Sequence, residues 1–142
     1  MSFFKREHDS VDWLTKVDFF SGFEARELQR VLSLSTEVES PAGTILIDQG
    51  DAGTHCFVVV EGSVAIYIAG EYVTSVAAGS MVGEMSLIDH RPRNASVVVE
   101  SDAKLLRFDA PQFRQLLDEM PKASERVMTL LHNRLAGETR TT

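Results

Sequence analysis

The chain has 142 residues, of which 44% are hydrophobic, enough for one domain with a sizeable buried core over residues 1–142. Fourteen basic and 21 acidic residues give a net charge of −7, which argues against broad electrostatic capture of nucleic acid or of an anionic membrane. Cys56 is the only cysteine, so an intramolecular disulfide is excluded, and no apolar run approaches the roughly 18 residues of a membrane span. We expect a cytoplasmic protein in which Cys56 is a buried strand thiol.

Residues 1–35 are predicted to be helical. Asp9 or Ser10 can cap a helix over "VDWLTKV", and Ser21 with Glu24 has the spacing of a capping box ahead of a second helix, "EARELQRVLSL". The second helix is amphipathic, and the apolar residues expected on its buried face are Ala25, Leu28, Val31 and Leu32. Both helices should therefore pack on a larger body.

Residues 36–108 form short β-rich runs separated by glycine-bearing turns. The runs are "TILID", "CFVVV", "VAIYIA", "YVTSV", "ASVVVES" and "KLLRF", and turns recur at roughly 8–12-residue spacing, typical of an antiparallel sandwich or barrel. Residues 83–88 lack a β-branched run and are predicted to be one helical turn between strands. The predicted fold class is mainly β with flanking α-helices, an antiparallel β-roll or jelly roll.

Residues 109–136 are predicted to form two C-terminal helices. Asp109 is a good N-cap for "APQFRQLLDEM", and a final helix should begin near Pro121. The residues expected on or near the apolar face of that final helix are Ala123, Val127, Leu130, Leu131 and Leu135. Residues 137–142 make a polar tail.

Patterns of catalytic and metal-binding residues are missing from the sequence. The histidines, His8, His55, His90 and His132, have no second ligand at metal spacing, and neither a P-loop nor a Gly-x-Ser-x-Gly elbow occurs. A cupin-type enzyme on a β-roll would need clustered histidines in its strands. We therefore expect a protein that catalyses no reaction and holds no metal.

The segment "VGEMSLIDHRPRNASV", residues 82–97, carries chemistry that the rest of the chain lacks. Gly83 followed by one helical turn lets backbone N–H groups converge on an anion, and Arg93 can meet two phosphate oxygens with one planar fork. Glu84 would repel a phosphate but would accept a hydrogen bond from a ribose hydroxyl, so the two charges together describe a nucleotide. The residues alone leave equal room for a surface ion pair of Glu84 with Arg93.

The same segment resembles the phosphate-binding cassette of the cyclic nucleotide-binding domain family, as in regulatory subunits of cAMP-dependent protein kinase and in cAMP-receptor-type proteins. "AGTILIDQGDAG" and "VVVEGSVAIYI" resemble the glycine-marked strands of that family's β-roll, so the likeness extends over about the whole chain. The resemblance implies that Glu84 takes the ribose 2′-OH and that Arg93 takes the cyclic phosphate. The candidate ligand-binding residues are Gly83, Glu84, Met85, Ser86, Leu87, Arg93, Asn94 and Ala95.

Further roles follow from the resemblance. Backbone N–H groups near Ser86 and Asn94 would complete the phosphate cradle, and Leu87 would be a hydrophobic hinge that senses movement of the cassette. Asn94 stands where alanine commonly accompanies cAMP preference and threonine accompanies cGMP preference, so cGMP stays open as a ligand. Arg91 and His90 fall in the variable loop and are expected to be exposed.

The function implied is a non-catalytic sensor of cAMP, or of cGMP, whose C-terminal helix moves to cover the base. Candidates for that cover are Met128, Leu131 and Leu135. We expect an effector protein in trans, a monomer or weak homodimer, and neither nucleic acid nor membrane as partner; a transcription factor of the cAMP-receptor type would need a helix-turn-helix after the last helix. The rival function is an orphan domain of the same fold that acts as a protein-interaction module without nucleotide binding.

Overall fold

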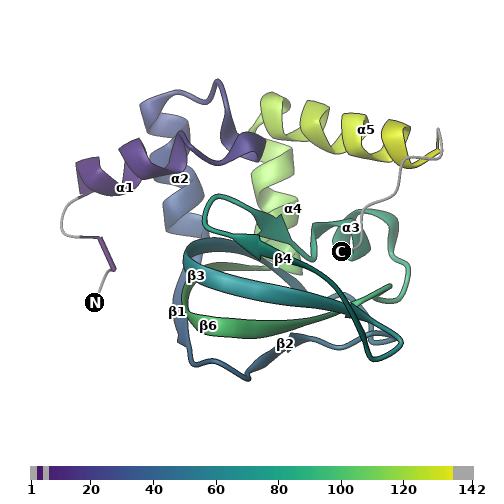
Figure 1. Cartoon of the computed structure of the whole chain (residues 1–142). Coiled ribbons are helices and arrows are strands. Elements are labelled where there is room, and N and C mark those ends of the chain that lie inside the picture. Colours follow the sequence, from purple (N-terminus) through teal and green to yellow (C-terminus); the bar gives the residue numbers. More distant parts are fainter. Residues whose placement is uncertain (1–2, 5–6, 136–142) are drawn as a thin grey trace.

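Two long strands form the spine of the protein in a computed structural model that describes residues 3–4 and 7–135 (Figure 1). Strands β3 (His55–Ile68) and β6 (Ser96–Asp109) pair antiparallel along their length, from His55 opposite Asp109 to Tyr67 opposite Ser96. Two short strands pair with each of them, all antiparallel: β1 (Thr36–Ser40) and β2 (Ile45–Ile47) with β6, and β4 (Glu71–Ala77) and β5 (Met81–Val82) with β3. The predicted antiparallel β-roll is confirmed.

The spine strands are apolar on both faces because each face meets a different core. Along β3, Cys56 and Val58 are buried in a core shared with the helices, whereas Phe57 and Val59 are buried inside the roll. Successive side chains of a strand point to opposite faces, so the residues of "CFVVV" are buried alternately in the two cores. The run therefore lacks the alternation of apolar and polar residues that is typical of a strand with one exposed face. Cys56 is fully buried, as predicted, and burial raises the pKa of its thiol well above the usual range.

The predicted strand break at "EG" is wrong, because these residues form a bulge within β3. The pairing register between β3 and β6 shifts on both sides of Glu61. Gly62 has a φ of +88°, and a Cβ there would lie 2.5 Å from the carbonyl oxygen of Asp102. Glycine therefore bends the strand where β6 approaches closely, and the runs "CFVVV" and "VAIYIA" belong to one strand. The runs "ASVVVES" and "KLLRF" likewise belong to the single strand β6.

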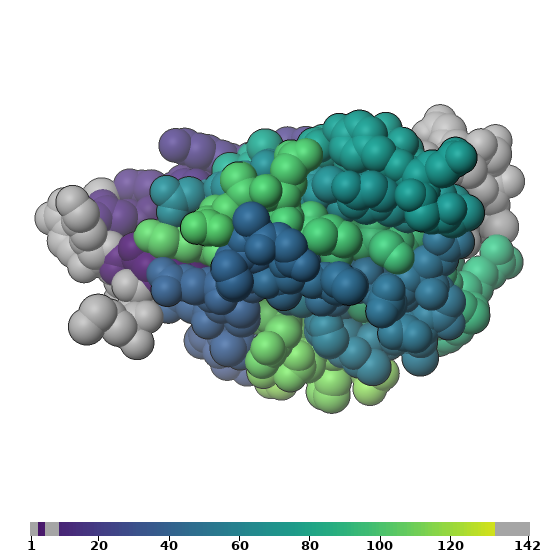
Figure 2. Space-filling model, turned by 60° about the horizontal axis from the view of Figure 1, so that its bottom comes forward, coloured from purple at the N-terminus to yellow at the C-terminus, as the bar shows by residue number. Residues whose placement is uncertain are grey.

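The helices that precede β1 and those that follow β6 gather at one end of the roll (Figure 1). They are α1 (Glu7–Leu14), the 3-10 helix η1 (Asp18–Phe20), α2 (Ala25–Leu34), α4 (Ala110–Glu119) and α5 (Pro121–Leu135). Their apolar side chains join those of β3 and β6 in one core. Viewed with the other end forward, blue, teal and green segments that are far apart in the sequence lie side by side (Figure 2). Among the described helices, none is long and apolar enough to cross a membrane.

Two predicted N-terminal caps are wrong. α1 begins at Glu7, so Asp9 and Ser10 lie inside the helix. The cap of α2 is Glu24, which forms a capping box with Glu27, while Ser21 ends η1. Phe23, the residue before this cap, is buried in the core shared by the helices. The buried face of α2 shifts accordingly: Ala25 is exposed, Leu32 is half-buried, and the buried residues are Leu28, Val31 and Leu34.

Asp109 caps α4 as predicted. It forms a capping box with Gln112, whose Oε1 accepts the backbone N–H of Asp109 at 2.9 Å. Asp109→Ala is expected to lower the free energy of unfolding by about 1 kcal/mol, the usual loss for an N-cap. Asp109→Asn keeps a capping oxygen and removes only the charge that lies 3.2 Å from Arg107, so it should cost much less. Urea unfolding compares the two variants, and equal losses would contradict the role of the cap.

Candidate functional site

The predicted helical turn is α3 (Glu84–Asp89), between β5 and β6. Its N-cap is Gly83, with a φ of +87°, and a Cβ there would lie 2.7 Å from Cδ1 of Ile47 and 2.9 Å from Nη1 of Arg93. Both the backbone conformation and the available space therefore require glycine. At the other end of α3, the N–H of His90 donates to the carbonyl oxygen of Ser86 at 3.1 Å.

Arg93 is buried against the start of α3, with 6% of its surface exposed. Its Nη1 donates to the carbonyl oxygen of Gly83 at 2.6 Å, and its Nη2 donates to the carbonyl oxygen of His55. A guanidinium carries five N–H donors, so these two bonds leave donors for an anion. The backbone of Arg93 is held as well: its N–H donates to the carbonyl oxygen of Asp51, and its carbonyl oxygen accepts the N–H of Gly50, both at 2.8 Å.

Glu84 is a second buried charge in the cassette, with 0% of its surface exposed. Burial lowers the pKa of the Arg93 guanidinium, and the nearby Cys56 and Glu84 act in the opposite direction. The alternative of a surface ion pair between Glu84 and Arg93 is wrong, since both side chains are buried. Charged groups are rarely buried because losing water is costly. Two opposite charges placed inside the roll indicate a site rather than a solvated face.

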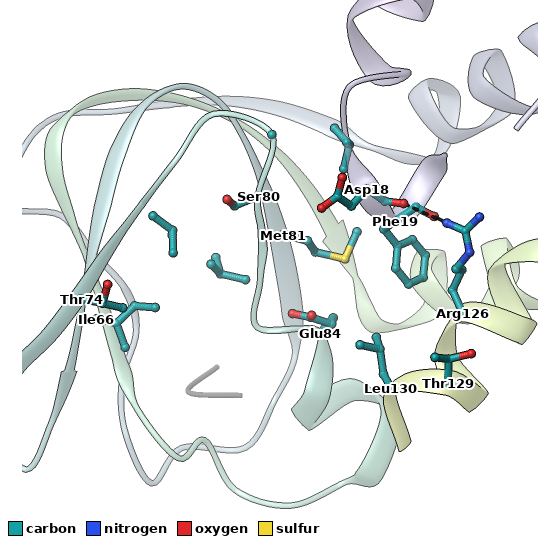
Figure 3. A pocket seen from close by; sticks show the side chains of 14 residues that line it. Asp18, Phe19, Ile66, Thr74, Ser80, Met81, Glu84, Arg126, Thr129 and Leu130 are labelled. Carbon is teal, nitrogen blue, oxygen red and sulfur yellow. Dashed lines mark hydrogen bonds between the residues drawn. The ribbon is translucent and has the colours of Figure 1, made fainter. Parts of the chain in front are cut away.

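A cavity of about 560 Å³ lies between the sheet and α5 (Figure 3). Its volume is within the range of roughly 300–1,000 Å³ that is usual for small-molecule sites. Glu84 borders this cavity while its side chain is fully buried, so the carboxylate lies at the wall rather than out in the space. The sheet contributes Ile66, Thr74 and Val76, and the helices contribute Asp18, Phe19, Arg126, Thr129 and Leu130.

The other predicted site residues lie outside the cavity lining. Arg93 is not in the cavity lining, but it donates to the carbonyl oxygen of Gly83, the residue between Val82 and Glu84 of the cavity wall. Leu87 is half-buried and packs against the core of the helices, and Asn94 is exposed. The remaining candidates, Met85, Ser86 and Ala95, are buried. Arg91 and His90 are exposed, as predicted.

Met128 and Leu131 are not among the residues that line the cavity, and the predicted cover over the base stays a prediction. Met128 is 66% exposed, Leu131 is half-buried against the helical core, and the side chain of Leu135 lies outside the described residues. The residues through which α5 borders the cavity are Arg126, Thr129 and Leu130. Leu130 was predicted on the apolar face of this helix, whereas Arg126 and Thr129 were missed because large apolar side chains were sought. Thr129 and Leu130 follow Arg126 by three and four residues, which places the three side chains on one helix face. This spacing is the signal in the sequence that could have grouped them.

Arg126 ties α5 to η1 at the edge of this cavity (Figure 3). Its guanidinium donates to the backbone carbonyl oxygens of Asp18, Phe19 and Ser21, at 2.8, 3.1 and 2.5 Å. The carbonyl oxygen of Asp18 also accepts the N–H of Ser21 at 3.1 Å, and the fork of the arginine reaches it and the two neighbouring carbonyl oxygens together. The position of α5 over the cavity is thereby fixed to the N-terminal part of the chain.

In the part of the chain that the structure describes, no three His, Cys, Asp or Glu side chains come together to hold a metal ion. The site is thus built from one buried carboxylate, one buried guanidinium and a cavity with mixed apolar and hydroxyl lining.

Comparisons with known proteins identify chains of similar sequence and fold. A curated relative, the Pycsar effector protein XpPycTIR of Xanthomonas perforans, is 32% identical over 109 residues, which are 76% of this chain and 36% of that protein. The solved structure of Thermus thermophilus catabolite activator protein is 28% identical, with a TM-score of 0.75 over 84% of this chain and 58% of that one. The regulatory domain of Toxoplasma gondii PKA, co-crystallised with cAMP, is 25% identical, with a TM-score of 0.76 over 94% of this chain and 51% of that one.

The chain spans little more than a third of the length of the curated relative and just over half of each of these two structures. Residues 37–120, which contain the cassette and all of the roll's spine, match the family model described as cyclic nucleotide-binding domain. The chain therefore belongs to the cyclic nucleotide-binding domain family.

Proposed function

We propose that this domain is a non-catalytic sensor that binds a cyclic nucleotide, cAMP by preference, in the cavity between the sheet and α5. The observation that carries the proposal is the meeting of two opposite buried charges at Gly83, next to a cavity of suitable size. Glu84 follows Gly83 directly, and Arg93 donates to its carbonyl oxygen. A ligand that offers both a hydroxyl donor and a phosphate anion complements this pair.

In this proposal the ribose lies against Glu84, and the cyclic phosphate lies at the start of α3 within reach of Arg93. The base then extends into the cavity, whose lining includes Ile66 and Thr74 of the sheet and Thr129 of α5. A threonine hydroxyl can donate or accept a hydrogen bond, so the lining suits adenine and guanine edges alike. The Toxoplasma gondii relative, whose structure holds cAMP, supports cAMP as the first ligand to test.

The core offers a route from the cassette to α5. Leu87 of α3 packs against the same core that contains Ala123 and Val127 of α5. An inward movement of α3 on ligand binding would therefore change the packing beneath α5, which in turn borders the ligand cavity. We propose that an effector protein in trans reads this change in α5.

Calorimetric titration of the chain with 3′,5′-cyclic mononucleotides of all four bases tests the proposal, with linear 5′-AMP as control. We expect saturable binding of cAMP, weaker binding of cGMP, and ligand recovered unchanged by chromatography. Tighter binding of a pyrimidine cyclic nucleotide would keep the class of ligand and overturn the choice of cAMP. Loss of ligand to a product would contradict a non-catalytic role. No binding of any would favour the protein-interaction module of the same fold.

A further inference from the structure

The loop between β2 and β3 touches both arms of the cassette. On one side, the backbones of Gly50 and Asp51 exchange hydrogen bonds of 2.8 Å with the backbone of Arg93. On the other side, Gly53 packs against Ser86, in the middle of α3. The loop therefore contacts both the segment that carries Arg93 and the helix α3, which carries Glu84. The distance between these two charged side chains depends on how closely the loop packs against each.

Gly53 approaches α3 more closely than any residue with a side chain could. A Cβ at this position would lie 2.6 Å from the Cβ of Ser86, 3.2 Å from its carbonyl carbon and 3.4 Å from its carbonyl oxygen. Of the described glycines, Gly53 is also the one whose φ is not positive. An alanine could adopt its backbone conformation, so space alone demands glycine here.

Ser86 cannot yield to a side chain at position 53 without moving the helix. It is buried, with 8% of its surface exposed, and it lies two residues from Glu84. Its carbonyl oxygen accepts the N–H of His90, the bond that closes the six-residue helix α3. A displacement of Ser86 is therefore passed to α3 as a whole, and with it to the carboxylate at the cavity wall.

We infer that Gly53 is a positioning residue, whose missing side chain sets the depth at which α3 lies against the loop that holds Arg93. Its effect on nucleotide affinity rests on the proposed function, whereas its effect on α3 does not. The closest approach to a Cβ at position 53 is that of the Ser86 Cβ, at 2.6 Å, and this part of the clash can be removed from either side. Ser86→Gly is therefore the substitution expected to rescue Gly53→Ala.

The test compares Gly53→Ala, Ser86→Gly and the double variant with the wild type. Gly53→Ala should raise the Kd for cAMP by about 10- to 100-fold, the size of effect expected when a binding group is misplaced by around 1 Å. It should also speed amide hydrogen exchange in residues 84–89 without ligand. In the double variant the 2.6 Å clash with the Cβ of Ser86 is gone and only the 3.2 Å approach to its carbonyl carbon remains, so both quantities should return most of the way to those of Ser86→Gly.

Gly70→Ala is the matched control for the added methyl group. A Cβ at Gly70 meets nothing within 4 Å, and the φ of +79° makes the substitution strained. It should lower the melting temperature while leaving the Kd and the exchange of α3 unchanged.

Unchanged exchange and affinity in Gly53→Ala, or a double variant no better than Gly53→Ala, would overturn the inference. Should Gly53→Ala fail to fold, recovery of folding in the double variant is the expected rescue, and its absence counts against the contact. A wild-type chain that binds no cyclic nucleotide would refute the proposed function, while exchange in α3 would still decide the role of Gly53.

Discussion

Arg93→Lys is expected to weaken binding of the cyclic nucleotide by on the order of 2–5 kcal/mol, which corresponds to about 30-fold to several-thousand-fold in Kd. Lysine keeps the positive charge but cannot meet two phosphate oxygens with a planar fork. A single ammonium also cannot reproduce the geometry in which Nη1 and Nη2 hold the carbonyl oxygens of Gly83 and His55. Calorimetric titration with cAMP at fixed ionic strength measures the loss.

Arg91→Lys is the matched control, because Arg91 lies two positions away in the same loop and is exposed. Its affinity for cAMP should equal that of the wild type. Arg93→Lys must be titrated well below its own melting temperature, since the guanidinium also links β3 to the start of α3. If its Kd were unchanged, Arg93 would be a structural clamp between β3 and the start of α3 and not the partner of the phosphate.

Features with local causes were predictable from the sequence. Gly83 followed by "EMSLID" indicates a helical turn because the signal needs only one glycine and the absence of a β-branched run, and α3 forms there. Asp109 was recognised for the same reason, as its cap reaches no further than Gln112. The resemblance of the cassette also marked Glu84 and Arg93, and the structure buries both.

Features caused by contacts distant in sequence were not predictable in this way. "EG" has the composition of a turn, and only the approach of Asp102 from β6 shows that Gly62 bends a continuous strand. The cavity lining was unpredictable for the same reason. Nothing in the sequence around Thr74 or Thr129 marks a binding site, and only the fold brings β4 and α5 to the same cavity. An apolar pattern on α5 could not show which of its faces borders the cavity.

Glu84→Ala is expected to abolish discrimination between cAMP and 2′-deoxy-cAMP. In the wild type, cAMP should bind more tightly by roughly 1.5–3 kcal/mol, the range for a hydrogen bond to a charged group. The deoxy ligand lacks the donor and leaves a buried carboxylate that has already lost its water. In the variant neither ligand finds that acceptor, so their affinities should converge. Four calorimetric titrations, two ligands on two proteins, measure the difference as a thermodynamic cycle.

The thermodynamic cycle separates a lost contact with the 2′-OH from a general loss of affinity. Removal of a fully buried side chain can loosen α3, but both ligands are compared on the same variant, so that loss affects the two titrations equally and cancels in the difference. Glu84→Gln adds a graded control, because its amide keeps an acceptor oxygen without the charge and should retain part of the discrimination. Equal binding of both ligands to the wild type would show that Glu84 does not read the 2′-OH. Its burial beside Arg93 would then be explained as a counter-charge for that guanidinium, whose pKa it raises against the effect of burial.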